Sequence, residues 1–252
     1  MMNQKNKAKL RKPLLFLLAA VVVAVTACAI YLADFYPADA EAIAAFSVDN
    51  TVEMRAAESG DLIWEPEGAT QGLIFYPGGK VEHTAYIPLM NELSSRGILC
   101  VVVEMPFHLA VLDINGAEGI REQFPQIEGW YIGGHSLGGS MAAAYLAACA
   151  DAFEGLILLG SYSATDLSAT DLAVLSVYGS EDMVMNREKY EESRGNLPKN
   201  VQELVIDGGC HAYFGMYGPQ DGDGTPAITN EAQIVICADA IEGWMERQAA
   251  LE

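Results

Sequence analysis

Short hydrophobic runs alternate with longer amphipathic stretches over most of the chain, from about Phe46 onward. Apolar runs of about four to seven residues are typical of buried strands, and apolar positions three or four apart are typical of helices. The runs predict strands at 72–76, 98–104, 129–133, 155–159, 173–178 and 201–206, after an opening hairpin at 48–54 and 61–65. The amphipathic stretches predict helices at 85–96, 113–124, 137–150, 185–194 and 231–248. This alternation predicts an α/β fold, with a mostly parallel central sheet and helices on both faces.

Residues 13–33 form a long apolar stretch without a charged side chain. About 20 such residues suffice for a helix to cross the hydrocarbon core of a membrane. The basic residues within 1–12 predict a cytoplasmic amino terminus. We therefore expect a basic cytoplasmic segment at 1–12, a transmembrane anchor or signal segment at 13–33 and a connector at 34–45. A globular domain at 46–252 is expected outside the cytoplasm, held at the cell membrane by this single-pass helix.

Two other interpretations of the amino terminus stay open. Val25-Thr26-Ala27-Cys28 resembles a bacterial lipoprotein signal with Cys28 as the lipidated residue, but the apolar run continues beyond it. A cleaved secretory signal normally has a shorter apolar stretch and a small-residue cleavage site. In all three cases the globular domain lies outside the cytoplasm.

The charge is distributed unevenly along the chain. All 34 acidic residues lie at Asp34 or later, and the formal net charge is −20. A surface this acidic repels nucleic acid phosphates and anionic lipid headgroups. We therefore expect no nucleic acid partner, and a membrane association that runs through the N-terminal helix alone.

No cofactor or metal is expected. The five cysteines are scattered and include no Cys-x-x-Cys pair, which argues against a disulfide framework and against zinc. Residues 221–225 (DGDGT) resemble the start of a calcium loop but lack the later ligands and the closing glutamate. A structured glycine turn near the active site is the expected role of this segment.

The strongest chemical signal is Gly134-His135-Ser136-Leu137-Gly138, which fits G-x-S-x-G. It follows a predicted strand and precedes a predicted helix, the context in which this motif presents a serine on a sharp turn. The helix that begins after Ser136 directs free N–H groups towards developing negative charge. Ser136 is therefore the candidate nucleophile, and His135, its neighbour, is expected to point away from the active face.

A serine hydroxyl needs a general base, and the base needs a carboxylate that orients it. His211 follows the last predicted strand, after the nucleophile, where a base is expected. Asp182 lies just beyond the strand at 173–178 and is the preferred acid, with the adjacent Glu181 as the alternative. Cys210 adjoins His211 and could serve as a nucleophile in principle, but its position favours a packing role.

The oxyanion that forms during acyl transfer needs two backbone donors. One is expected from Leu137, the residue after the nucleophile. The other is expected from the loop at 76–80, with Gly79 preferred and Lys80 next. The Lys80 side chain could also attract an anionic substrate group, although a solvated lysine is the commoner outcome.

These motifs resemble those of the α/β-hydrolase superfamily, and more narrowly those of small bacterial membrane-anchored hydrolases related to dienelactone hydrolases. The matching stretches are 76–86 (YPGGKVEHTAY), 133–139 (GGHSLGG), 178–184 (YGSEDMV) and 208–228. The resemblance covers roughly residues 46–250 and implies the α/β-hydrolase fold with a triad of Ser136, Asp182 and His211. Dienelactone hydrolases have a cysteine nucleophile, so their substrate does not carry over.

The expected substrate is a carboxylic ester with a small acyl group. Residues 160–172 are short and polar, so no large lid is expected over the site. The site is then open and bounded by 106–112 and 212–226, with Phe107, Tyr213, Phe214 and Tyr217 as substrate-binding residues. The leading hypothesis is a serine hydrolase that works through an acyl-enzyme. A non-catalytic surface binding module of the same fold, or a peptidase or amidase on the same triad, are the alternatives.

Overall fold

The computed structural model describes residues 4–46 and 52–250, with side chains from residue 16 onward. The helices are α1 (Gln4–Ala33), α2 (Ala40–Ala45), α3 (Ile87–Ser95), α4 (Leu137–Leu146), α5 (Arg187–Ser193) and α6 (Asn230–Ala249). The strands are β1 (Met54–Ala56), β2 (Leu62–Trp64), β3 (Gln71–Tyr76), β4 (Leu99–Val102), β5 (Gly129–His135), β6 (Gly155–Leu159), β7 (Ala173–Gly179) and β8 (Val201–Ile206). The chain divides into two compact units, one that ends at Phe35 and one that begins at Tyr36.

The first unit is essentially the helix α1. Its window Phe16–Ala33 is fully unburied, and among the described residues it is the one helix that is both long and apolar enough to cross a membrane. A signal sequence passes the same test. The finding fits the expected anchor or signal segment at 13–33.

The second unit is built on a sheet with the strand order β1-β2-β4-β3-β5-β6-β7-β8 among the described residues. The six strands from β4 to β8 in this order run parallel, and β1 and β2 are antiparallel to their neighbours. The predicted α/β fold with a mostly parallel sheet is therefore confirmed. Parallel strands bring their carboxyl ends to one edge of the sheet, which is where ligands bind in such folds.

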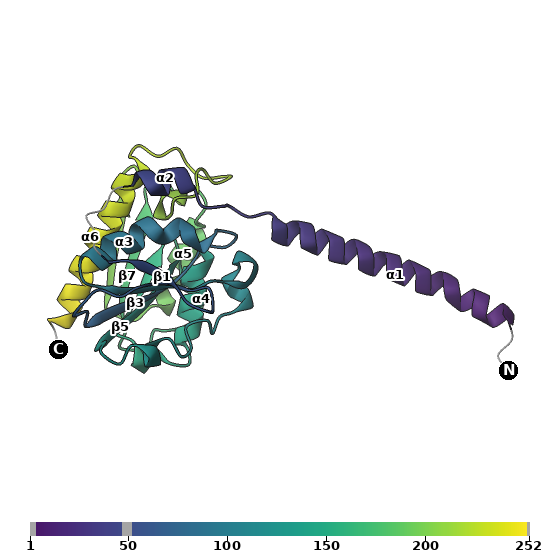
Figure 1. Cartoon of the computed structure of the whole chain (residues 1–252), viewed down its shortest axis with the longest axis horizontal. Helices are drawn as coiled ribbons and strands as arrows, with labels where there is room; N and C mark the ends of the chain where they lie inside the picture. Colours follow the sequence, from purple (N-terminus) through teal and green to yellow (C-terminus); the bar gives the residue numbers. More distant parts are fainter. Residues whose placement is uncertain (1–3, 47–51, 251–252) are drawn as a thin grey trace. The chain divides into compact units, whose positions relative to one another are not determined.

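Helices cover both faces of this sheet. α3 and α6 lie side by side on one face, and α4 contacts β3, β5 and β6 on the other (Figure 1). Side chains alternate across β3: Leu73 and Phe75 pack in the core beneath α3 and α6, whereas Ile74 and Tyr76 pack in the core on the opposite face. A strand buried on both faces needs a continuous apolar run, which explains the uninterrupted pattern of the inner strands.

The stretch after Phe35 packs on the second unit. The N–H of Tyr36 donates to the carbonyl of Lys80 at 2.7 Å, and its carbonyl accepts the N–H of Glu82 at 3.0 Å. The N–H of Asp39 donates to the carbonyl of Met216 at 2.9 Å. The connector expected at 34–45 is thus, from Tyr36 onward, an integral part of the compact unit.

The prediction of a helix at 113–124 is wrong. The structure has turns over this segment, with a single short 3-10 turn at Arg121–Gln123. The hydroxyl of Tyr76 donates to the carbonyl of Ile114 and accepts the N–H of Ala117, each at 2.8 Å. These are backbone groups that a helix would pair internally, and Gly119, with a φ of 77°, interrupts helical geometry.

The other predicted elements are present with shifted ends. The first strand begins at Met54 in the structure, and most of the predicted stretch at 48–54 falls on residues 47–51, outside the described residues. α4 ends at Leu146, before the expected end at residue 150, and α5 begins at Arg187, after the expected start at 185. Residues 160–172 between β6 and β7 contain no helix, which confirms that no large lid is inserted there.

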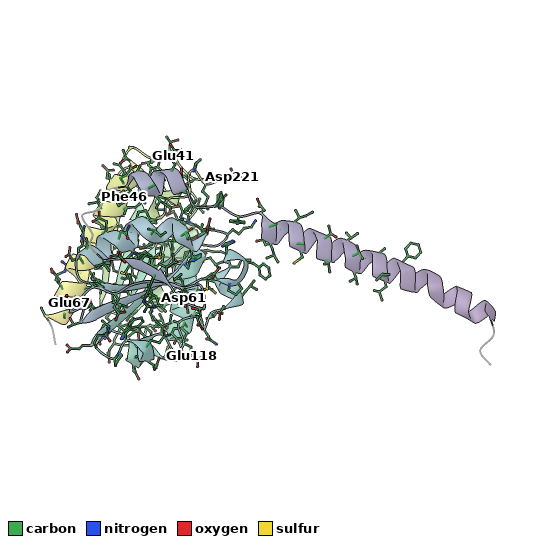
Figure 2. The ribbon with its side chains drawn as sticks, viewed as in Figure 1. Glu41, Phe46, Asp61, Glu67, Glu118 and Asp221 are labelled. Carbon is green, nitrogen blue, oxygen red and sulfur yellow. The ribbon has the colours of Figure 1, made fainter. Side chains whose placement is uncertain are left out.

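Carboxylates are spread over the surface of the second unit. Figure 2 shows Glu41, Glu67, Glu118 and Asp221 around its outline with their side chains towards solvent, and all four residues are exposed.

Candidate active site

Ser136 is the single residue between β5 and α4. Its φ of 52° and ψ of −121° lie in a region that L-residues rarely adopt. Its N–H donates to the carbonyl of Leu159 at 2.9 Å, which joins this turn to the end of β6. A Cβ on Gly134 or Gly138 would lie 2.6 or 2.2 Å from the carbonyl oxygen of Tyr76. Both glycines are therefore required by close backbone approach, and they leave the serine at the apex of the turn.

Asp182 and His211 form a buried pair. Asp182 Oδ2 lies 2.8 Å from His211 Nδ1, and the side chains are almost completely buried. The second carboxylate oxygen, Oδ1, accepts the N–H groups of Val184 at 3.0 Å and Met185 at 2.8 Å. With Nδ1 donating to the carboxylate, Nε2 carries the lone pair that a general base needs. In the part of the chain that the structure describes, this buried Nε2 has no hydrogen-bond partner.

The candidate triad residues follow three strands at the carboxyl edge of the sheet. Ser136 follows β5, Asp182 lies beyond β7 and His211 lies beyond β8. β6 runs between β5 and β7 and continues into Gly160, which has a φ of 51°. A Cβ on Gly160 would lie 2.9 Å from His211 Nδ1 and 3.1 Å from Asp182 Oδ2. The backbone after β6 therefore touches the Asp182–His211 pair directly.

His135 and Tyr86 lie beneath the candidate site, and the sequence did not identify either as part of it. The ring centroid of His135 is 4.5 Å from that of His211. His135 Nδ1 lies 2.8 Å from the hydroxyl of Tyr86, which accepts the N–H of Gly78 at 2.9 Å. Burial lowers the pKa of His135 well below its ordinary value, and the neighbouring His211 lowers it further. His135 thus packs as a neutral imidazole against the candidate base.

The loop after β3 lies beside the start of α4. A Cβ on Gly79 would lie 3.0 Å from Leu137 Cδ2, so the backbone of Gly79 runs close to Leu137. The first N–H groups of a helix have no intrahelical partner, which leaves that of Leu137 available to an oxyanion. The N–H of Lys80 donates to the carbonyl of His108 at 2.7 Å and is therefore engaged within the protein. The geometry favours Gly79 over Lys80 as the second donor.

Four non-glycine residues among those that the structure describes have a positive φ. They are Lys80 at 61°, Phe107 at 52°, His108 at 58° and Ser136 at 52°. Such conformations are uncommon outside glycine and concentrate at functional sites. Two of the four, Ser136 and Lys80, belong to the candidate nucleophile turn and oxyanion loop, and the carbonyl of His108 accepts the N–H of Lys80.

A hollow of about 240 Å³ adjoins Ser136. Its lining comes from the start of α4, from the segment after β6 and from the segment before α5. The lining residues are Ser136, Leu137, Ser140, Gly160, Ser161, Tyr162, Val184, Met185 and Asn186. Drug-sized ligands occupy clefts of roughly 300–1,000 Å³, so this hollow fits a smaller group.

The four aromatic residues expected to bind substrate differ in how far they are exposed. Phe107 is 61% exposed, and Tyr213 is half-buried. Phe214 and Tyr217 are buried, and their rings pack against His135 with centroid separations of 5.6 and 6.4 Å. None of the four lines the hollow beside Ser136. Sequence reasoning missed Tyr162 and Asn186, which follow strands but belong to no recognisable motif.

Two alternatives weighed from the sequence have unfavourable surroundings. Glu181 is exposed and accepts the hydroxyl of Ser180 at 3.0 Å, whereas its neighbour Asp182 contacts the histidine. Cys210 is buried, and desolvation, followed by the charge of Asp223, raises the pKa of its thiol to about 12. A thiol with so high a pKa is almost entirely protonated at neutral pH and is a poor nucleophile.

No cluster of three or more metal-ligating side chains is found among the described residues. The segment at 221–225 instead binds protein backbone: the carboxylate of Asp223 accepts N–H groups, among them that of Ala212 at 2.8 Å.

The model of the alpha/beta hydrolase family matches residues 72–235 of the chain. This range holds the turn with Ser136, the Asp182–His211 pair and most of the sheet. No curated protein sequence matches the chain.

Solved structures share the fold at low sequence identity. A dienelactone hydrolase from Anabaena variabilis is 14% identical with a TM-score of 0.59, over 77% of this chain and 99% of that one. Est1E from Butyrivibrio proteoclasticus is 15% identical with a TM-score of 0.56, over 79% and 99%. A predicted CIB-like hydrolase from Thermoplasma acidophilum is 16% identical with a TM-score of 0.56, over 77% and 99%.

Proposed function

Because this chain belongs to the alpha/beta hydrolase family, we propose that it is a serine hydrolase that cleaves carboxylic esters of small acyl groups through an acyl-enzyme. The observation that carries the proposal is the buried Asp182–His211 hydrogen bond of 2.8 Å, at the strand edge where Ser136 occupies a strained turn. A carboxylate that fixes the histidine tautomer, at the same sheet edge as a half-buried serine on a strained turn, is the arrangement that acyl transfer needs.

In the proposed reaction, Ser136 Oγ attacks the ester carbonyl and His211 Nε2 takes the hydroxyl proton. The new C–O bond converts the carbonyl into a tetrahedral oxyanion, which the N–H groups of Leu137 and Gly79 stabilise. The C–O bond to the alcohol then breaks, and His211 returns the proton to the departing oxygen. Water, activated by His211, hydrolyses the acyl-enzyme in the same way. Asp182 keeps its charge throughout and stabilises the imidazolium.

The preference for small acyl groups rests on the surroundings of Ser136. The adjacent hollow measures about 240 Å³, and no helix is inserted between β6 and β7. The lining of this hollow mixes polar residues, such as Ser140 and Asn186, with apolar ones, such as Val184 and Met185. A long acyl chain would find little apolar surface to cover it and would gain little from binding.

A fluorophosphonate probe tests the nucleophile, because it phosphonylates an activated serine. Ser136 Oγ should displace fluoride from the probe, so that the purified chain gains the mass of one probe less HF. Ser136→Ala should abolish both labelling and ester turnover while the protein stays folded. Ser140→Ala is the matched control, because Ser140 lines the same hollow and should not be labelled. A chain that labels equally well without Ser136 contradicts the proposal.

A substrate panel separates the remaining alternatives. p-Nitrophenyl esters of graded chain length should be hydrolysed, and peptide amides should react much more slowly. Faster cleavage of amides would favour a peptidase or amidase on the same triad. An absence of both labelling and turnover would favour a binding module that retains only the fold.

We also propose that α1 holds the enzyme at the cell membrane with the catalytic unit outside the cytoplasm. The apolar window Phe16–Ala33 and the basic residues before it support this orientation. Protease added to intact cells should release the catalytic unit. A unit that stays protected until the membrane is broken would contradict this topology, and globomycin-sensitive processing at Cys28 would favour a lipoprotein.

A further inference from the structure

The carboxylate of Asp223 is held by four backbone N–H groups. Oδ2 accepts from Ala212 at 2.8 Å. Oδ1 accepts from His211 at 3.2 Å, from Gly224 at 2.8 Å and, at a longer 3.4 Å, from Met183. The proposed reaction assigns no step to this residue, although the sequence drew attention to its glycine–aspartate segment.

Three of these four N–H groups belong to the segments that carry the candidate acid and base. His211 is itself the base, Ala212 follows it and Met183 follows Asp182. Asp182 and His211 lie on loops that follow different strands, β7 and β8. A single carboxylate thus links the two loops at the positions where they present the pair.

The glycines beside Asp223 explain how its carboxylate reaches this position. Gly222 has a φ of 82°, a conformation that favours glycine. A Cβ on Gly224 would lie 2.0 Å from the carbonyl oxygen of Glu181, so the loop runs in direct contact with the segment that bears Asp182. The glycines of the segment that resembled a calcium loop therefore let its backbone lie close to the segments that carry Asp182 and His211.

We propose that Asp223 is a positioning residue, which holds the loops of Asp182 and His211 in register so that Nε2 of His211 can take the proton of Ser136. This inference rests on the proposed serine hydrolase activity. Displacing a catalytic group by about 1 Å can cost about 100-fold in rate, because catalysis depends on near-attack geometry. Charge-assisted hydrogen bonds to backbone N–H groups are strong enough to provide such a constraint.

The closing experiment compares Asp223→Ala and Asp223→Asn with the control Asp221→Ala in the full-length protein. Asp221 lies in the same loop, is exposed and points to solvent (Figure 2). Each protein is titrated with a fluorophosphonate to count competent sites. kcat and KM for p-nitrophenyl butyrate are then expressed per labelled site.

Asp223→Ala is expected to lower kcat per labelled site about 10- to 100-fold while KM changes less than about twofold. Asp223→Asn retains one acceptor oxygen and is expected to recover part of this loss. Asp221→Ala is expected to match the wild type. A wild-type kcat per site in Asp223→Ala overturns the proposal, as does a loss of turnover that only parallels a loss of labelled sites. If the wild type neither labels nor turns over, the proposed function itself is contradicted.

Discussion

The hydroxyl of Tyr86 lies 2.8 Å from Nδ1 of His135 and accepts the N–H of Gly78, so one buried phenol connects the histidine of the nucleophile turn to the candidate oxyanion loop. His135 in turn packs against His211 at a centroid separation of 4.5 Å. Buried contacts through Tyr86 and His135 therefore connect the nucleophile turn, the candidate base and the candidate oxyanion loop.

Tyr86→Phe should weaken catalysis. The change leaves the Gly78 N–H and His135 Nδ1 buried without their partner, at a cost of about 1–3 kcal/mol for each group. The loop that presents Gly79 should lose its alignment, and we expect kcat to fall about tenfold. Tyr190→Phe is the control, because its hydroxyl contacts Ser176 and Glu203 outside the candidate site. Equal kcat values for the two variants in steady-state assays would contradict this role.

His135 should make the fold sensitive to acid. Its pKa is depressed in the folded protein, so below about pH 6.5 the unfolded chain binds a proton that the folded chain does not. The free energy of unfolding should therefore fall as pH decreases from about 6.5, by at most about 1.4 kcal/mol per pH unit from this group. Urea titrations between pH 7.5 and 5 should show a shallower decline for His135→Asn. Parallel curves for variant and wild type would rule out this contribution.

Gly160→Ala should disturb the Asp182–His211 pair. The added Cβ would lie 2.9 Å from His211 Nδ1, and the φ of 51° is unfavourable for alanine. We expect a large loss of kcat and a loss of stability of about 1 kcal/mol or more. Gly195→Ala is the control, because the added carbon would meet no atom within 4 Å beyond its neighbours in the chain. Activity assays together with thermal unfolding of both variants provide the comparison.

Acyl chain length should decide the rate of ester cleavage. Each methylene that is removed from water on binding contributes about 0.8 kcal/mol, but the small hollow beside Ser136 offers little room for additional methylenes. Acetyl to butyryl esters should have higher kcat/KM than esters of about 12 carbons, without activation at a lipid interface. A higher kcat/KM for the long ester, measured below its micelle concentration, would refute this expectation.

The stretch that begins at Tyr36 should be needed for activity. Its backbone bonds to Lys80 and Glu82, in the segment after β3, and to Met216, in the segment after His211. A soluble protein that starts at Asp34 should retain wild-type kcat. One that starts at Phe46 should be less stable and less active, because Tyr36 and Asp39 are lost. Thermal unfolding and butyrate hydrolysis of the two proteins test this, and equal values would show that the stretch is dispensable.

The parts that the sequence predicted depend on local patterns. The buried strands follow from uninterrupted apolar runs, and the Ser136 turn follows from glycines at fixed spacing. The proximity of Asp182 and His211 follows from their positions after neighbouring parallel strands, which end at the same edge of the sheet.

The parts that it did not predict depend on contacts between distant residues. Residues 113–124 have an amphipathic pattern, but the hydroxyl of Tyr76 hydrogen-bonds the carbonyl of Ile114 and the N–H of Ala117. Phe214 and Tyr217 are aromatic, as residues that bind an apolar substrate group often are, but they are buried and their rings pack against His135. Asp223 accepts the N–H groups of His211 and Ala212, but no local sequence pattern predicts the path of the glycine-rich loop that brings it there.

The positive φ angles of Lys80, Phe107, His108 and Ser136 lower the free energy of unfolding of the protein. Each such conformation costs on the order of 1–3 kcal/mol, and a typical domain is stable by only about 5–15 kcal/mol. The strained backbone of Ser136 therefore lowers the stability of the fold at the point where the proposed reaction takes place. Selection for thermal stability alone would favour glycine or asparagine at these positions, and at Ser136 that replacement would remove the proposed nucleophile.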